Sequence, residues 1–185
     1  MFYIVIFIAI AIASYMVQAN LQRKFKRYSQ VAVSAGLTGR EVAEKMLRDH
    51  GITDVQVIST PGQLTDHYNP TTHTVNLSEG VYESCSVAAA AVAAHECGHA
   101  VQHQHAYAPL RLRSSLVPVV QVASRWTPWL LLGGILTLTI FPQILLAGII
   151  LFALTTLFSF VTLPVEIDAS RRAIAWLQGA GITSA

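Results

Sequence analysis

The residues that could carry chemistry lie together in one short segment, His95-Glu96-Cys97-Gly98-His99. On an α-helix, residues four positions apart lie one turn above the other, so His95 and His99 would point the same way and could bind one metal ion. Glu96 would lie about 100° around the helix from His95, where its carboxylate can contact a water on that metal. This pattern predicts the zinc-binding helix of a metallopeptidase, with Zn²⁺ as its cofactor.

The residues before and after this segment predict the helix that the spacing requires. Residues 88–94 are alanine except for one valine, alanine is the best helix former, and Pro109 closes the segment downstream. The alternative is a buried alanine-rich helix whose histidines only make hydrogen bonds. Zinc catalysis uses three protein ligands and one open position, so another ligand must come from elsewhere in the chain.

Three residues compete to be that third ligand. His105 lies ten positions after His95, the spacing of one metallopeptidase motif, but that motif needs a glycine where this chain has Gln102. Glu166 and Asp168 are two positions apart and would lie about 200° apart around a helix, so they would not both face one metal. Glu166 has the longer reach, and Asp168 can be explained as a dipole partner of a helix start.

Composition divides the chain into apolar and ordinary regions. Of its 185 residues, 53% are hydrophobic and only 12% are charged, which is outside the usual range of soluble proteins. Residues 2–19 and 126–163 are almost uncharged, whereas residues 20–115 have an ordinary globular composition. The pattern predicts a membrane protein with one water-facing domain, and a net charge of +2 gives no reason to expect a nucleic acid partner.

The two cysteines, Cys85 and Cys97, are too few for a disulfide framework, which favours a reducing compartment. The position of Cys97 in the predicted helix turns it away from the histidine face. We therefore expect a small buried apolar residue there and not a metal ligand.

Basic residues indicate how the apolar segments cross the membrane. The first apolar run is about 18 residues long, roughly 27 Å of helix, which is enough to span a hydrocarbon core. It is followed at once by a cluster of basic residues, Arg23, Lys24, Lys26 and Arg27. This asymmetry predicts an uncleaved anchor whose C-terminal flank is cytoplasmic, and the cluster could also lie against anionic lipid.

The second apolar tract, residues 126–163, is interrupted by Pro142. The proline predicts a transmembrane hairpin, with residues 116–124 available to lengthen its short first arm, and the alternative is a re-entrant hairpin. Either form returns the chain to the cytoplasmic face. Pro164 then predicts the first turn of a final helix over residues 165–178.

The water-facing region should contain both helix and strand. Thr38 and Glu41 form a capping box that predicts a helix start, and Gly51 fits its C-terminal end. Residues 52–59 and 73–78 alternate like strands, with residues 64–70 as a polar loop between them. In the second strand we expect the even-numbered residues to face outward, including Asn76. That strand is either a free edge on which a peptide substrate adds or an ordinary edge strand.

Five segments resemble the YugP-type neutral zinc metallopeptidases of prokaryotic membranes, which are similar in logic to the HtpX-like membrane proteases. The matching segments are residues 36–39, 62–68, 93–102, 107–111 and 161–172. The resemblance implies that His95 and His99 are metal ligands, that Glu96 is the base, and that Glu166 is the third ligand. The HtpX-like pattern has an aspartate four residues after that glutamate, where this chain has Ser170. The family also implies a further apolar segment after residue 185, so we expect a shorter member or a shortened chain.

The sequence therefore predicts a membrane α+β protein, with a mainly α-helical zincin-like domain and a small β-sheet. The expected divisions are a transmembrane anchor (1–20), a cytoplasmic zincin-like domain (21–125), a transmembrane hairpin (126–163) and a helix that completes the zinc site (164–185).

The predicted function is that of a multi-pass plasma-membrane zinc endopeptidase with its site on the cytoplasmic side, using metal-activated water and a glutamate base. Its partners would be a peptide or membrane-protein substrate and the lipid bilayer. Two other classes stay open, a membrane scaffold with a structural zinc site and a zinc hydrolase of non-peptide substrates. Candidates for stabilising the oxyanion are His67, Tyr68, Tyr107 and Arg171.

Overall fold

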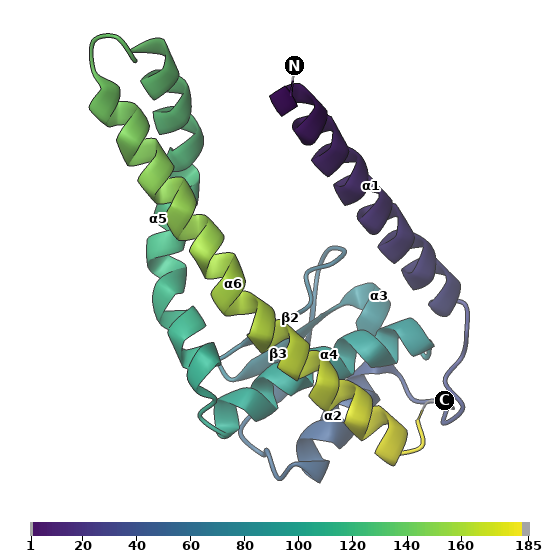
Figure 1. Ribbon diagram of the computed structural model, residues 1–185. Helices are drawn as coiled ribbons and strands as arrows, with labels where there is room; N and C mark the ends of the chain where they lie inside the picture. The colour runs from purple at the N-terminus through teal and green to yellow at the C-terminus, as the bar shows by residue number, and fades with distance from the viewer. Residues whose placement is uncertain (1, 183–185) are drawn as a thin grey trace. The chain divides into compact units, whose positions relative to one another are not determined.

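The computed structural model describes residues 2–182, and its helices and strands are labelled in Figure 1. The fold is mostly helical with a small mixed sheet, as predicted. The expected anchor and final segment each extend beyond the described residues, at position 1 and at positions 183–185. The elements are α1 (Phe2–Tyr28), α2 (Gly39–Asp49), β1 (Gln56–Thr60), β2 (His67–Asn69), β3 (Thr74–Ser78), α3 (Glu79–Tyr82), α4 (Val87–Gln104), α5 (Ala108–Leu136) and α6 (Pro142–Gly179).

The chain forms two compact units. The first runs to Ala100 and also takes in the chain from Ala173 onward. It holds α1, α2, the sheet, α3 and most of α4. The second runs from Val101 to Arg172 and holds α5 and most of α6.

Helix α2 begins and ends where the sequence predicts. The Thr38 hydroxyl accepts a hydrogen bond from the Glu41 N–H (3.2 Å), and the Glu41 carboxylate accepts one from the Thr38 N–H (2.8 Å). After the helix, Gly51 adopts a φ of 71°, the left-handed conformation that glycine tolerates best. The apolar face of α2 is buried, and its members are Val42, Ala43, Met46 and Leu47.

The sheet has the strand order β1-β3-β2, with β1 parallel and β2 antiparallel to β3. The predicted loop over residues 64–70 was wrong in part, because residues 67–69 form strand β2. Strand β2 is too short to show an alternating pattern. It is held by the turn that follows it, where Asn69 Oδ1 accepts hydrogen bonds from the N–H groups of Thr71 (2.9 Å) and Thr72 (3.3 Å).

Strand β3 lies in the centre of the sheet and not at its edge, so the expectation of a free edge there was wrong. Asn76 was also expected to face outward, but it is only 8% exposed. Its amide donates to the carbonyl of His67 in β2 (3.3 Å) and to Thr74 Oγ1 (3.0 Å), which explains why a polar side chain is buried there. The edge strands of the sheet are β1 and β2.

Helix α4 packs through very small side chains. Its buried residues include Ala93, Ala94 and Cys97, each 0% exposed. The Cys97 thiol donates to the carbonyl of Ala43 in α2 (3.6 Å), and burial raises the pKa of this thiol. Cys97 is therefore a small buried residue, as predicted, and its protonated thiol is poorly suited to bind a metal.

Helices α5 and α6 form a helical hairpin within the second unit (Figure 1). The chain turns between Leu136 and Pro142, where the sequence predicts the break. Near the turn the two backbones come close, because a Cβ added at Gly134 would lie 2.5 Å from Leu145 Cα. The hairpin is longer than expected, since α5 already begins at Ala108.

Pro164 does not begin a new helix, so this prediction was wrong. Helix α6 runs without a break from Pro142 to Gly179, with Pro164 inside it. A proline inside a helix removes one backbone hydrogen bond and strains the preceding turn, but it does not oblige the helix to end. Glu166 and Asp168 therefore lie within a long helix and not in a first turn.

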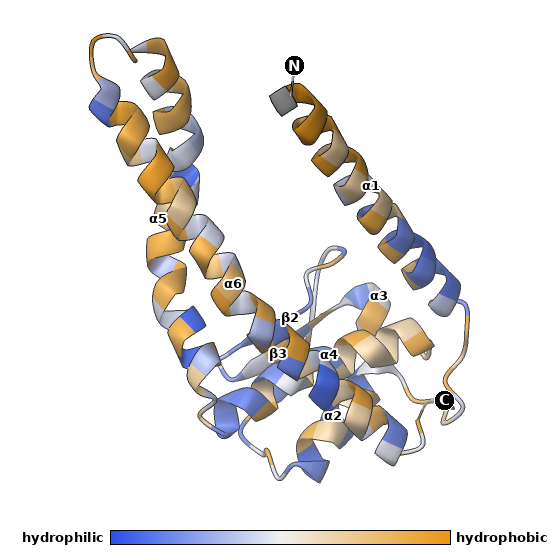
Figure 2. Ribbon diagram, viewed as in Figure 1, coloured by the Kyte–Doolittle hydropathy of each residue, from blue (hydrophilic) through white to orange (hydrophobic). Residues whose placement is uncertain are grey.

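Within residues 2–182, two helices are long and apolar enough to cross a membrane, Ile4–Tyr28 and Pro142–Gly179, with mean hydropathies of 2.1 and 2.6 over their most apolar windows. Figure 2 shows the hydrophobic colouring over the first part of α1 and over the end of the α5–α6 hairpin that carries the turn. Helix α1 continues beyond the expected anchor through the basic cluster to Tyr28.

Candidate metal centre

Three side chains that the sequence singled out come together in the structure. His95 and His99 in α4 and Glu166 in α6 each offer a ligand atom, and these atoms lie within 4.8 Å of one another. The imidazole rings of His95 and His99 have centroids 4.9 Å apart at an interplanar angle of 82°. Ligands of a tetrahedral zinc lie about 2.0–2.2 Å from the metal, hence roughly 3.4 Å from each other. Two imidazole nitrogens and one carboxylate oxygen are the kind of donor set that holds a catalytic zinc with one open position. Atoms as far apart as 4.8 Å would have to move closer together to bind one ion.

The helix itself explains the histidine pair. The two residues are one turn apart in α4, which extends unbroken from Val87 to Gln104. His99 is 7% exposed and His95 is partly exposed, so the pair has one side in the interior and one side accessible. This is the arrangement that a catalytic metal needs, since its open position must be reached by substrate.

Gln102 links α4 to the segment of α6 that carries the carboxylates. Its side chain is 0% exposed, and its Nε2 donates to the Val165 carbonyl (2.8 Å) and to Asp168 Oδ2 (2.8 Å). Residues on both sides of Glu166 are thus bound to α4. We conclude that Gln102 helps to fix where Glu166 lies along α4.

The other two candidates for the third ligand have different surroundings. Asp168 Oδ2 accepts hydrogen bonds from Gln102 and from Arg172 Nε (2.6 Å). His105 is exposed in the turn that follows α4. Among the described residues, neither belongs to the cluster that His95, His99 and Glu166 form.

Glu96, the predicted base, is held by the backbone of the sheet. The Tyr68 N–H of β2 donates to Glu96 Oε2 (3.0 Å). Burial raises the pKa of the Glu96 carboxyl above its ordinary value, and the nearby His99 and His95 and the Tyr68 N–H offset part of this rise. A carboxylate with a raised pKa accepts a proton more readily.

The four candidates for oxyanion stabilisation have different surroundings. His67 Nδ1 lies 2.7 Å from the Thr65 carbonyl, and its side chain is exposed. Tyr107 is the N-cap residue of α5 but makes no capping hydrogen bond with its side chain, and Arg171 is exposed on α6. Burial raises the pKa of the Tyr68 phenol.

Three groups that contact the candidate site residues were not identified from the sequence. The Tyr68 N–H left no signal, because a backbone group in a loop-like segment has no pattern of its own. Gln102 was mentioned only because it occupies the position where the His105 motif needs a glycine. A glutamine among alanine and valine on an apolar helix is itself a sign of a buried polar contact. Arg113, whose guanidinium Nη2 lies 3.6 Å from Glu166 Oε1, was not singled out as a site residue, because no local pattern connects it to residue 166.

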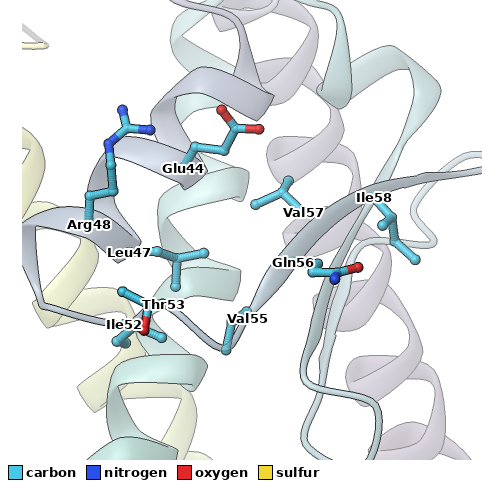
Figure 3. Close-up of a pocket in the computed structure, with 9 residues that line it drawn as sticks. All are labelled: Glu44, Leu47, Arg48, Ile52, Thr53, Val55, Gln56, Val57 and Ile58. Carbon is cyan, nitrogen blue, oxygen red and sulfur yellow. The ribbon is translucent and has the colours of Figure 1, made fainter.

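A separate pocket of about 490 Å³ lies between α2 and β1 (Figure 3). Its lining is mainly apolar, with Leu47, Ile52 and Val55, and Glu44 and Arg48 add one charge of each sign. No member of the metal centre lines it. The pocket is therefore distinct from the site described above.

Comparison with known proteins shows which family the chain belongs to. A family model described as "Putative neutral zinc metallopeptidase" matches residues 3–185. A relative named "Putative membrane protease YugP", from Bacillus subtilis (strain 168), is 44% identical over 173 residues, which cover 94% of this chain and 76% of the relative. No solved structure matches the chain. The chain therefore belongs to the neutral zinc metallopeptidase family that this model describes.

Proposed function

We propose that this chain is a membrane-integrated, zinc-dependent endopeptidase. The observation that carries the proposal is the convergence of His95, His99 and Glu166 within 4.8 Å, with Glu96 directly beside the first histidine. Family membership and the name of the relative support zinc and membrane proteolysis. A structural zinc site would have no need of a carboxylate next to its first histidine.

In this proposal each residue has one role. His95, His99 and Glu166 hold the metal, which when bound lowers the pKa of water and polarises the scissile carbonyl. Glu96 accepts the proton of the attacking water and then donates it to the leaving amine. The Tyr68 N–H donates to Glu96 Oε2 and so keeps the carboxylate in one orientation during both transfers.

We also propose the membrane arrangement and the domain organisation expected from the sequence. Residues 1–20 would anchor a cytoplasmic zincin-like domain over residues 21–125, and residues 126–163 would form a transmembrane hairpin. Residues 164–185 would complete the zinc site on the cytoplasmic face. The hydropathy of α1 and α6 and the name of the relative support association with the membrane. The substrate would be an extended peptide or a membrane protein.

The experiment compares the purified full chain with its Glu96→Gln variant. Zinc content is measured first, followed by cleavage of a generic unfolded protein with and without a chelator. We expect Glu96→Gln to retain zinc and to lose at least about 100-fold in turnover, because an amide cannot accept the water's proton. Glu83→Gln makes the same substitution at an exposed position and should leave both zinc content and turnover unchanged.

The outcomes separate the classes of function. Comparable turnover by Glu96→Gln would show that the base lies elsewhere. A zinc-replete chain that cleaves no unfolded protein would favour a scaffold with a structural zinc site. Chelator-sensitive hydrolysis of ester or amide substrates that are not peptides, without proteolysis, would indicate a zinc hydrolase of another class.

A further inference from the structure

Arg113 in α5 is the cation that the structure places against the candidate third ligand. Its Nη2 lies 3.6 Å from Glu166 Oε1, and both residues belong to the second compact unit. The Arg113 side chain is 33% exposed. Its Nε atom is buried and has no hydrogen-bond partner among the described residues.

This contact differs from an ordinary surface ion pair. An ion pair on the surface is screened by water and contributes little to stability. Such a pair would not by itself compensate for burying part of a guanidinium group. Arg113 instead buries Nε without a partner, which carries a free-energy cost. We therefore expect another contact of this guanidinium to offset the cost. The contact that the structure shows is with the Glu166 carboxylate.

A glutamate ligand needs such a partner. Its side chain has several freely rotating bonds, and ligating carboxylates are generally held in place by groups outside the coordination sphere. The residue one turn after Glu166 is Ser170, which carries no charge, whereas Arg113 brings a positive charge to the carboxylate. Asp168 has other partners, because its Oδ2 accepts hydrogen bonds from Gln102 and Arg172.

We propose that Arg113 is a positioning residue that holds the Glu166 carboxylate in place for the metal. The guanidinium fixes the carboxylate through Oε1 and reduces the number of orientations that Glu166 must give up when the ion binds. This inference rests on the proposed function in one respect, the assignment of Glu166 as a zinc ligand.

The test measures zinc affinity of the full chain in detergent, by competition with a chromophoric chelator. We expect Arg113→Ala to weaken zinc binding about 10- to 100-fold, the usual effect of removing a group that orients a ligand. Arg113→Lys, which keeps the charge but not the planar fork, should recover part of this loss. Arg111→Ala removes the same charge from an exposed position of the same helix and should bind zinc like the native chain.

A second readout follows the ligand directly. Cobalt(II) replaces zinc, and its visible absorption reports the number and geometry of ligands. We expect the Arg113→Ala spectrum to shift towards that of Glu166→Ala, and the Arg111→Ala spectrum to match the native one. If Arg113→Ala loses helical content by circular dichroism, Arg113→Gln, which keeps much of the side-chain stem, is judged by the same criteria.

The result that overturns the inference is native zinc affinity and a native cobalt spectrum in Arg113→Ala, even if turnover falls, because the arginine would then act on substrate. The zinc assay needs no substrate, so its outcome is separate from that of the proposed function. If the native chain cleaves no substrate but Arg113→Ala binds zinc more weakly than the native chain, the peptidase proposal is refuted and the inference about Arg113 stands. If Glu166→Ala retains its full zinc content, Glu166 is not the third ligand and the inference about Arg113 is refuted. The peptidase proposal would then need another third ligand.

Discussion

Replacing Gln102 by leucine should destabilise the second unit and weaken the metal centre together. The native amide is fully buried and donates to the Val165 carbonyl and to Asp168 Oδ2, each at 2.8 Å. Leucine has a similar volume and cannot donate to either acceptor. The Val165 carbonyl and Asp168 flank Glu166 in α6, so the change removes the polar contacts of α4 on both sides of the candidate ligand.

The size of the effect follows from these two hydrogen bonds. A neutral hydrogen bond contributes about 1 kcal/mol and one to a charged group about 1.5–3 kcal/mol. Asp168 keeps its bond to Arg172, and burial of the leucine side chain returns about 1 kcal/mol, so we expect a net loss of about 1.5–3 kcal/mol. For a chain of this size that corresponds to a thermal midpoint lower by about 3–12 °C.

The assay is thermal unfolding of the full chain in one detergent, together with the zinc competition measurement. Gln104→Leu makes the same substitution two positions along, at an exposed site of the same helix, and should leave both quantities unchanged. Gln102→Glu should be worse than Gln102→Leu at neutral pH, because it sets a second carboxylate against Asp168. The reasoning would be refuted by a Gln102→Leu variant whose midpoint and zinc affinity match those of Gln104→Leu.

The remaining predictions concern the third ligand and the topology. Glu166→Ala should lose bound zinc, whereas His105→Ala and Asp168→Ala should largely keep it; zinc retained by the first variant, or lost by the other two alone, would reassign the ligand. Cysteines introduced at positions 50 and 180, in a chain whose native cysteines are replaced, should both be protected from an impermeant reagent outside intact cells. Labelling of the two positions on opposite sides would show that the hairpin does not return the chain to the cytoplasmic face.

Local patterns were interpreted correctly where the physical cause was itself local. The capping box at Thr38 and the left-handed Gly51 involve residues within one turn of each other, so the sequence alone determines them. The same holds for His95 and His99, because the period of a helix sets their spacing. The turn before Pro142 belongs to this group, since a proline is readily accepted at the start of a helix.

The errors arose where a local signal depended on distant parts of the chain. Pro164 can begin a helix or lie inside one, and the continuous α6 shows that the sequence did not decide between these. Strand β2 is too short to have a pattern of its own and exists through its pairing with β3. That pairing also places β3 in the centre of the sheet and buries Asn76.

The sequence alone placed two candidate ligands and a candidate base on one helix, because three neighbouring residues and the helical period are enough for that. It gave Glu166 as one of three candidates for the third ligand, and the resemblance singled it out, since no periodicity connects α6 to α4. The tertiary structure decided which carboxylate lies near the histidines and which groups surround it. Those contacts, from Gln102 to Asp168 and from Arg113 to Glu166, join residues far apart in the chain, and they exist only once the helices pack.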